Sequence, residues 1–388
     1  MTDVSMGIWE RIKNLGASLL HIDWILFGLA LVISLAGLLT MNSFEGQSYY
    51  YHRQIIWIII SVVVFFVASI IDWRFLRRTT VVTWLYIVSA TLLLLLFAVG
   101  SIFRGAQSWF SLGGLSFQPS DLAELVLIIL LAKYFSRRHV EIADVRHILI
   151  SGLYAFILFV LVFLQPDFGA AIILFCVWLG MVLVSGISIK HLLSVFALGI
   201  FSFIILWGFV FKPYQKDRIL TFIHPLTDIR GSGYNAYQST IAVGSGRILG
   251  KGVGYGTQSK LQFLPEYQTD FIFAAFAEEW GFVGASVLMI LYAIVLWRIV
   301  SNAFYGASNF ETLFGLGLAI LFFTHIVIHV GMNIGLLPVT GQTTPFMSYG
   351  GSHLILEFLG LGILMGMRKY NRSANKLDVK NEFVGIIS

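Results

Sequence analysis

Carboxylates at the beginnings of long apolar segments are the residues of this sequence whose type and spacing best suit chemistry. Asp121 and Glu124 follow the short polar stretch 118–120, and their spacing of three places both on one face of a helix. Asp270 begins another apolar segment, directly after a polar and basic one. A carboxylate partly removed from water there can hold a pKa that suits a general base. The structural alternative is capping, because acidic residues at a helix start bind free amides and oppose the helix dipole.

Three further carboxylates admit the same two interpretations. Asp167 begins an apolar segment after Gln165-Pro166, where capping and function are equally good explanations. Glu278 shares a helix face with Asp270, whereas Glu279 points away from it and is expected to form a structural pair.

The polar segment 212–268 joins two apolar segments and carries much of the positive charge. Loops of this length are either functional or disordered, and residues such as Tyr237 and Leu249 indicate a structured one. A basic, structured surface suits an anionic group such as a pyrophosphate, whereas attraction to lipid headgroups is the simpler alternative. Its basic residues are Lys212, Lys216, Arg218, Arg230, Arg247, Lys251 and Lys260.

The glycines between positions 231 and 256 do not form a nucleotide-binding loop. Ser245 stands where the first glycine of that pattern belongs, and no Ser or Thr follows Lys251. These glycines either let backbone amides approach an anion or let the loop fold tightly.

His325, His329 and Trp109 each have a structural and a functional interpretation. The two histidines have the i, i+4 spacing of metal ligands, but no third ligand is near in sequence, so we expect packing or interhelical hydrogen bonding. Trp109 is either an anchor at the membrane interface or a platform on which a sugar stacks.

The composition places all these residues in a membrane protein. The chain of 388 residues is 58% hydrophobic and 12% charged, whereas soluble domains carry about a quarter charged residues. A backbone in lipid must satisfy its own hydrogen bonds, so the apolar stretches are helices. We expect an all-α integral membrane protein of about ten transmembrane helices, with one long structured external loop between helices 7 and 8. The stretches are 22–42, 54–71, 79–99, 119–135, 148–163, 168–185, 190–211, 270–298, 311–333 and 345–367.

The distribution of Lys and Arg orients these helices. Most of them fall in the loops on one side, whereas the short loops of the other side carry only Arg53 and Arg104. Both termini are therefore expected in the cytoplasm, with segment 212–268 on the other side of the membrane. We expect an interfacial amphipathic segment at 1–21, a membrane domain at 22–367 and a disordered basic tail at 368–388. The net charge of +5 lies in loops and indicates no nucleic-acid partner.

Four stretches resemble the RodA/FtsW (SEDS) family, and the likeness covers nearly the whole chain. They are GAQSWFSLGGLSFQPSDLAEL (105–125), QPDFGAA (165–171), the segment containing FLPEYQTDFIF (216–281) and NIGLLPVTGQTTPFMSYGGS (333–352). The sequences FLPEYQTDFIF and GLLPVTG are more similar to those of the RodA branch, which acts in elongation, than to those of FtsW, which acts in division. The resemblance implies a peptidoglycan glycosyltransferase of the bacterial inner membrane that polymerises lipid II. It also implies partnership with a class B penicillin-binding protein and other membrane proteins of the elongation machinery.

The resemblance places the family's catalytic aspartate at Asp270. Glu124 stands where the family usually has lysine, so an ion pair with Asp121 within one helix cannot form. The residues 342–344 also differ from the family's usual run, and His353 replaces a small polar residue.

The implied reaction joins a sugar hydroxyl to an anomeric carbon whose leaving group is a lipid pyrophosphate. It needs a base on the hydroxyl, which Asp270 can provide, and positive charge on the leaving group. A divalent cation, Mg²⁺ or Mn²⁺, is a candidate to assist the basic loop, and no metal site made by the protein alone is expected. A lipid II flippase and a non-catalytic scaffold are the alternatives. The residues expected to bind substrate are Trp109, Asp121, Glu124, Arg218, Arg247, Lys251, Lys260, Glu266 and Thr269.

Overall fold

The chain folds as a bundle of long helices, shown by a computed structural model. It describes residues 21–42, 48–103, 106–112, 115–136, 145–186, 188–210, 216, 220, 222, 233–261 and 263–384. The long helices are α2 (Trp24–Asn42), α3 (Ser48–Ile70), α4 (Thr79–Val99), α5 (Pro119–Ser136), α6 (Val145–Leu164), α7 (Phe168–Val184), α8 (Ile189–Ile205), α12 (Ile272–Phe304), α13 (Asn309–Asn333) and α14 (Gly351–Val384). Each of these helices overlaps one predicted span, with differences at the ends. Helices α2, α3, α4, α6, α12 and α13 are each long and apolar enough to cross a bilayer. The predicted all-helical, multi-pass membrane fold is confirmed.

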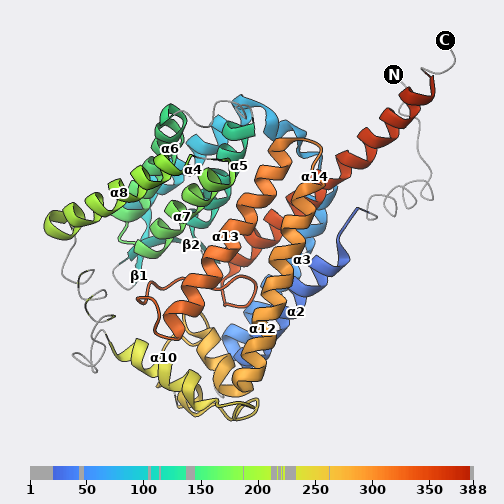
Figure 1. Cartoon of the computed structure of the whole chain (residues 1–388). Coiled ribbons are helices and arrows are strands. Elements are labelled where there is room, and N and C mark those ends of the chain that lie inside the picture. The colour runs from blue at the N-terminus through green and yellow to red at the C-terminus, as the bar shows by residue number, and fades with distance from the viewer. Residues whose placement is uncertain are drawn as a thin grey trace.

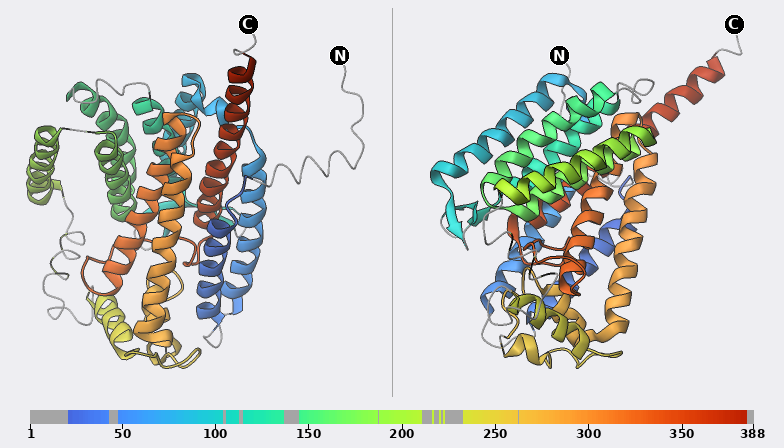
Figure 2. Two further views of the ribbon diagram at one scale, coloured as in Figure 1. Left: turned by 45° about the vertical axis from the view of Figure 1, so that its right-hand side comes forward. Right: turned by 60° about the vertical axis from the view of Figure 1, so that its left-hand side comes forward.

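Helix α13 is the central element of the bundle. It packs against α5 and α7 on one side and against α12 on the other, while α14 packs along α3 although the two are far apart in sequence (Figures 1 and 2). Gly317 permits the close approach of α13 to its neighbours. A Cβ there would lie 2.7 Å from atoms of both Ile128 on α5 and Met181 on α7, so only a hydrogen atom fits.

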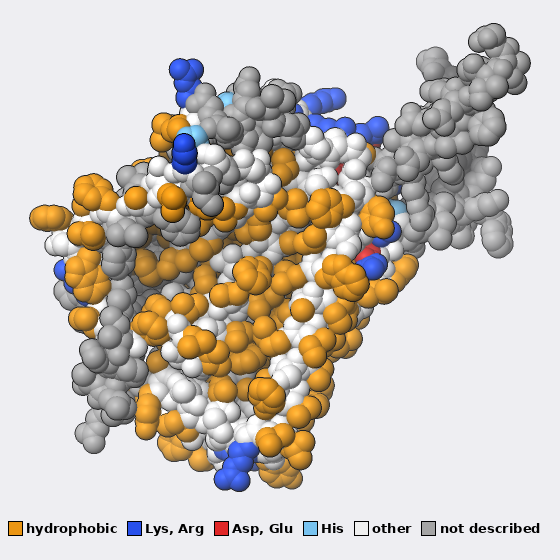
Figure 3. Space-filling view, in the orientation of Figure 1, with side chains coloured by type: hydrophobic (Ala, Val, Ile, Leu, Met, Phe, Trp, Pro, Cys, Tyr) orange, Lys and Arg blue, Asp and Glu red, His pale blue; other side chains and the backbone are white. Residues whose placement is uncertain are grey.

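The flank of the bundle is apolar. Ile290 and Trp297 on α12 are exposed, as are Ile56 and Val63 on α3. Hydrophobic side chains cover most of the face seen in Figure 3, and Lys and Arg lie mainly toward its two ends. An apolar flank of this extent fits contact with lipid rather than with water.

The segment 212–268 contains two short helices where the structure describes it. They are α10 (Tyr234–Ser245) and α11 (Thr257–Lys260). α10 lies at the end of the bundle opposite to the C-terminal end of α14 (Figures 1 and 2). The expectation of a structured loop is met over residues 233–261.

Several local features differ from the sequence-based expectation. A small antiparallel sheet, which was not predicted, joins α4 to α5 through β1 (Ser101–Phe103), β2 (Ala106–Leu112) and β3 (Leu115–Phe117). α14 begins at Gly351 rather than at position 345 and continues to Val384, so most of the tail expected to be disordered is helical. A short 3₁₀ helix, η1 (Trp73–Arg77), and a short π-helix, η2 (Leu206–Val210), complete the described elements. Almost all of the expected amphipathic segment 1–21 lies outside the described residues.

Candidate functional site

Asp270 lies in the turn that leads from segment 212–268 into α12. The helix begins at Ile272 and is capped by Phe271, so Asp270 precedes the helix that it was expected to open. Its side chain is half-buried. This position gives the carboxylate a fixed backbone and also access to solvent, which a base that meets a substrate requires.

A tight turn holds Glu266 and Thr269 beside Asp270. The amides of Thr269 and Phe271 donate to the carbonyl oxygen of Glu266 over 3.1 and 3.2 Å, and the Thr269 hydroxyl donates to Glu266 Oε2 over 3.3 Å. Glu266 has φ of +53°, an uncommon conformation for a residue with a side chain and one that often marks functional sites. Tyr267 is buried beneath the turn, and burial raises its pKa to about 12, so its hydroxyl stays protonated at neutral pH.

Asn333, at the end of α13, fixes the backbone of this turn by hydrogen bonds of its side chain. Its Nδ2 donates to the carbonyl oxygens of Asp270 (2.9 Å) and His329 (2.8 Å), and its Oδ1 accepts from the Ala274 amide (3.1 Å). Ser239 of α10 donates to the Asn333 carbonyl over 2.8 Å. This fully buried side chain therefore joins α13, α12 and α10 at the position of Asp270. The sequence analysis gave it no role, although an asparagine at the end of an apolar helix was a signal.

The loop between α13 and α14 forms a second support. Ser348 Oγ donates to the Thr269 carbonyl over 3.0 Å, and the Tyr349 amide donates to the Gln268 carbonyl over 2.8 Å. Gly341 has φ of +74°, and a Cβ there would lie 3.5 Å from Asp270 Oδ2. The loop therefore holds the backbone of the turn, and Gly341 lies close to the Asp270 carboxylate.

Lys251 is engaged by a buried carboxylate. Its Nζ lies 2.7 Å from Glu278 Oε1, and Glu278 is fully buried. The same carboxylate accepts hydrogen bonds from the Gln258 amide (3.0 Å), the Thr257 hydroxyl (3.2 Å) and Ser259 (3.3 Å from its hydroxyl). The ion pair of Lys251 with Glu278 thus holds the glycine-rich part of segment 212–268 against α12, a structural role that was not predicted from the sequence.

The glycines of this segment serve close packing against a break in α12. Gly281 has φ of +66° and ψ of −167°, which is a glycine conformation. At the break, the amides of Phe282 and Val283 donate to the carbonyls of Arg247 (2.8 Å) and Ile248 (3.1 Å). A Cβ at Gly250 would lie 2.1 Å from the Glu279 carbonyl. The structure therefore supports tight folding rather than an anion cradle.

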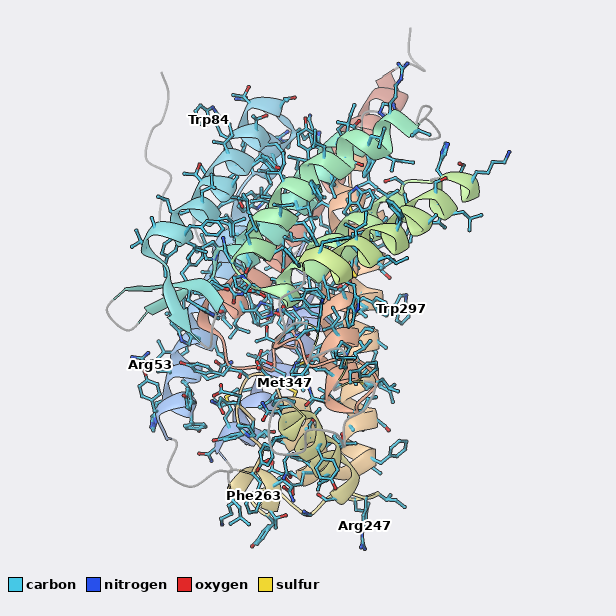
Figure 4. The ribbon with its side chains drawn as sticks, turned by 90° about the vertical axis from the view of Figure 1, so that its left-hand side faces the viewer. Arg53, Trp84, Arg247, Phe263, Trp297 and Met347 are labelled. Carbon is cyan, nitrogen blue, oxygen red and sulfur yellow. The ribbon has the colours of Figure 1, made fainter. Side chains whose placement is uncertain are left out.

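The other predicted substrate contacts are distributed over the α10 end and the small sheet. Arg247 and Lys260 are exposed. Arg247 points out from the α10 end of the bundle, whereas Met347 lies in its interior (Figure 4). Trp109 is half-buried in β2. Arg218 lies outside the described residues.

Asp121 and Glu124 are brought together in the interior of the bundle. Glu124 Oε2 lies 3.1 Å from His325 Nε2 of α13, and Asp121 Oδ2 lies 3.8 Å from His353 Nδ1 of α14. The expected interhelical bonding of His325 is confirmed. His325 and His353, on α13 and α14, thus face the two carboxylates of α5, which have no lysine at position 124 beside them. Asp121 and Glu124 are 8% and 2% exposed, which leaves little surface for the predicted contact with substrate.

Asp167 has the capping role that was one of its two interpretations. It precedes α7, and its Oδ1 accepts from the Ala170 amide over 3.1 Å. Its Oδ2 accepts from Gln118 Nε2 over 3.1 Å.

No group of three or more His, Cys, Asp or Glu side chains within the described ranges is arranged to hold a metal ion. The divalent cation therefore stays a prediction from the chemistry alone, and we derive no step through it.

Comparison with known proteins gives a family and several relatives. The family model FtsW/RodA/SpoVE, described as "Cell cycle protein", matches residues 17–373. The peptidoglycan glycosyltransferase MrdB of Escherichia coli is 38% identical over 76% of this chain and 79% of its own. Stage V sporulation protein E of Bacillus subtilis is 32% identical over 89% of this chain and 94% of its own. A probable peptidoglycan glycosyltransferase FtsW of Haemophilus influenzae is 33% identical over 94% of both chains. The relatives thus come from both branches of the family.

Two solved structures share the fold. A chain from a peptidoglycan synthase complex, studied for the coordination of polymerization and crosslinking, is 31% identical and has a TM-score of 0.78. The match covers 91% of this chain and 99% of that one. The rod shape determining protein RodA of Thermus thermophilus is 29% identical with a TM-score of 0.68, over 90% of this chain and 97% of its own.

Proposed function

This chain belongs to the FtsW/RodA/SpoVE family, and we propose that it polymerises lipid II into glycan strands during cell-wall elongation, with Asp270 as the general base. Peptidoglycan glycosyl transfer is the activity for which its relatives MrdB and FtsW are named. The observation that carries the proposal is half-buried Asp270, at the place where the basic segment enters the bundle, with its backbone held by Asn333 and the neighbouring turn held by the loop before α14.

In the proposed reaction Asp270 accepts the proton of the attacking sugar hydroxyl. The oxygen forms a bond to the anomeric carbon of the second lipid-linked sugar. The bond from that carbon to the pyrophosphate oxygen breaks, and the lipid pyrophosphate leaves with the electron pair. A base held within hydrogen-bond reach of the hydroxyl contributes about 10²–10⁴-fold to the rate of such a step.

The leaving pyrophosphate requires positive charge near the same end of the bundle. Arg247 and Lys260 are exposed there and are the residues we assign to it, together with Arg218 from outside the described ranges. Lys251 is left out of this set, because Glu278 already engages its ammonium group over 2.7 Å.

The proposed orientation places α10 and the turn at Asp270 on the external side, with both termini in the cytoplasm. Arg77 ends η1, just before α4, and Lys133 lies in the last turn of α5. Both then face the cytoplasm, as basic residues of short loops do. Polymerised glycan must be crosslinked, and the matching chain of a peptidoglycan synthase complex supports a class B penicillin-binding protein as partner. We expect further membrane proteins of the elongation machinery around this pair.

The experiment is polymerisation of labelled lipid II by purified, monodisperse protein without any other glycosyltransferase. The proposal expects glycan strands. A flippase would instead move lipid II between the leaflets of proteoliposomes without extending it, and a scaffold would do neither, so either result would replace the proposed function.

A further inference from the structure

A small cavity lies between α5, α13 and α14, among side chains that the proposed reaction does not use. The space open to the centre of a water molecule is ≈ 20 Å³, and about 10–15 Å³ is enough to hold one water molecule. The described residues that line it include neither Lys nor Arg. Its titratable residues, all buried, are Asp121, Glu124, His325, His353 and Glu357.

The contacts of His325 require a proton between this histidine and Glu124. The Thr343 carbonyl, 3.2 Å from Nδ1, can only accept a hydrogen bond, so Nδ1 carries a proton. A neutral imidazole protonated there has a lone pair on Nε2, which lies 3.1 Å from Glu124 Oε2. Two lone pairs at this distance repel each other. A proton on either Nε2 or the carboxyl group is therefore part of the contact.

His353 stands between two further carboxylates, and their charge favours a second proton at this place. Its Nδ1 lies 3.8 Å from Asp121 Oδ2, and its Nε2 lies 2.9 Å from Glu357 Oε1. Ionised carboxylates only accept, and a neutral imidazole has a single donor. The two negative charges are offset if His353 is doubly protonated, or one of them is removed if a carboxyl group carries the proton. Without these protons, three carboxylates would lie in a membrane interior with no compensating charge from the cavity lining.

Three atoms at this cavity have no hydrogen-bond partner within the described part of the chain. They are Glu124 Oε1, His353 Nε2 and Glu357 Oε1. The last two are close but poorly aligned, so their proximity does not make a hydrogen bond. Since buried polar atoms in folded proteins are nearly always bonded, a water molecule in the cavity can serve them.

We infer that this cavity is a proton-binding site around a bound water molecule. The Glu124–His325 pair and His353 with its two carboxylates together hold at least two protons more than neutral imidazoles and ionised carboxylates would. The protons between α5, α13 and α14 are therefore lost as pH rises, whereas the charge of a lysine or arginine would stay. Other titratable groups close to the cluster are His329 on α13, Tyr292 on α12 and Asp167 before α7. This inference does not depend on the proposed glycosyltransferase reaction.

The first test is equilibrium unfolding of the purified full-length protein in mixed micelles between pH 7.5 and 9. The unfolded chain binds none of these protons there, since ordinary Glu and His side chains have pKa values of about 4.3 and 6.5. Each proton that only the folded protein holds lowers the folding equilibrium constant about tenfold per pH unit, so stability falls as pH rises. Glu124→Gln removes one carboxylate and provides an amide donor to His325, so the folded variant binds one proton fewer. Its folding equilibrium constant should therefore lose one factor of about ten less per pH unit than that of wild type.

The matched control is Glu311→Gln at the other end of α13. Glu311 is also a buried carboxylate, but its partner is Arg77, which stays charged throughout this range. The control should keep the pH dependence of wild type. If Glu124→Gln also kept it, the inference would be wrong.

A second test uses the wild-type protein and so does not depend on how the variants fold. Nitrogen NMR of histidine-labelled protein at pH 7.5 distinguishes doubly from singly protonated imidazoles, and infrared spectra distinguish a protonated from an ionised carboxyl group. We expect a doubly protonated histidine that is absent from His353→Gln, or a protonated carboxyl band that is absent from Glu357→Gln or Asp121→Asn. A neutral His353 beside fully ionised carboxylates would contradict the inference.

Discussion

Replacing Lys251 by methionine decides whether this lysine stabilises the packing of segment 212–268 on α12 or binds the substrate. Nζ and Glu278 Oε1 are 2.7 Å apart, and at an effective dielectric constant of about 20 their attraction is about 6 kcal/mol. Much of that offsets the removal of Glu278 from water, since this carboxylate is fully buried. Loss of one partner of a buried pair costs about 3–5 kcal/mol. Because the lysine side chain is 27% exposed, we expect the lower end, about 3 kcal/mol of unfolding free energy.

The assay combines equilibrium unfolding with lipid II turnover per folded molecule. The double variant Lys251→Met/Glu278→Gln removes both charges, so it should recover most of the lost stability. Turnover by folded Lys251→Met should stay close to that of wild type. Unchanged stability combined with lost turnover would refute the structural role and return Lys251 to the pyrophosphate site.

Three further predictions follow from the site and the orientation. Gly281→Ala should destabilise the protein by more than about 2 kcal/mol in thermal unfolding, because its backbone conformation is one that only glycine adopts readily. Asn333→Ala should lower polymerisation more than lipid II binding, since it frees the Asp270 backbone; equal losses of both would contradict this positioning role. In a cysteine-free background, Tyr255→Cys should react with an impermeant thiol reagent in intact spheroplasts and Thr79→Cys should not, and the reverse pattern would invert the proposed orientation.

The spans and the location of Asp270 could be predicted because lipid leaves the backbone few choices. Every apolar stretch of sufficient length has to be a helix, so composition alone locates the bundle. Asp270 was visible because a carboxylate between a basic segment and an apolar one is unusual. The separation of Asp270 from the start of α12 could not be predicted, because the turn at Glu266 depends on hydrogen bonds from Thr269 and Phe271 rather than on apolar patterning.

The partners of the buried charges could not be predicted from local sequence. Lys251 and Glu278 are 27 positions apart, and Glu124 and His325 are 201 apart. Such pairs depend on which helices become neighbours, which hydropathy does not specify. The small sheet was missed because its outer strands contain only three residues each, too few for an alternating pattern. The start of α14 was misplaced because the preceding loop, although partly apolar, folds back onto the turn at Asp270.

The most direct measurement of the central claim is lipid II polymerisation by purified Asp270→Asn. Asparagine keeps the size of the side chain and most of its hydrogen bonding but cannot accept the proton of the attacking hydroxyl. We expect a loss of about 10²–10⁴-fold in rate, with lipid II binding and unfolding close to wild type. The control is Asp167→Asn, which can still cap α7 and should retain polymerisation. Near-normal glycan strands from Asp270→Asn would contradict the assignment of Asp270 as the general base.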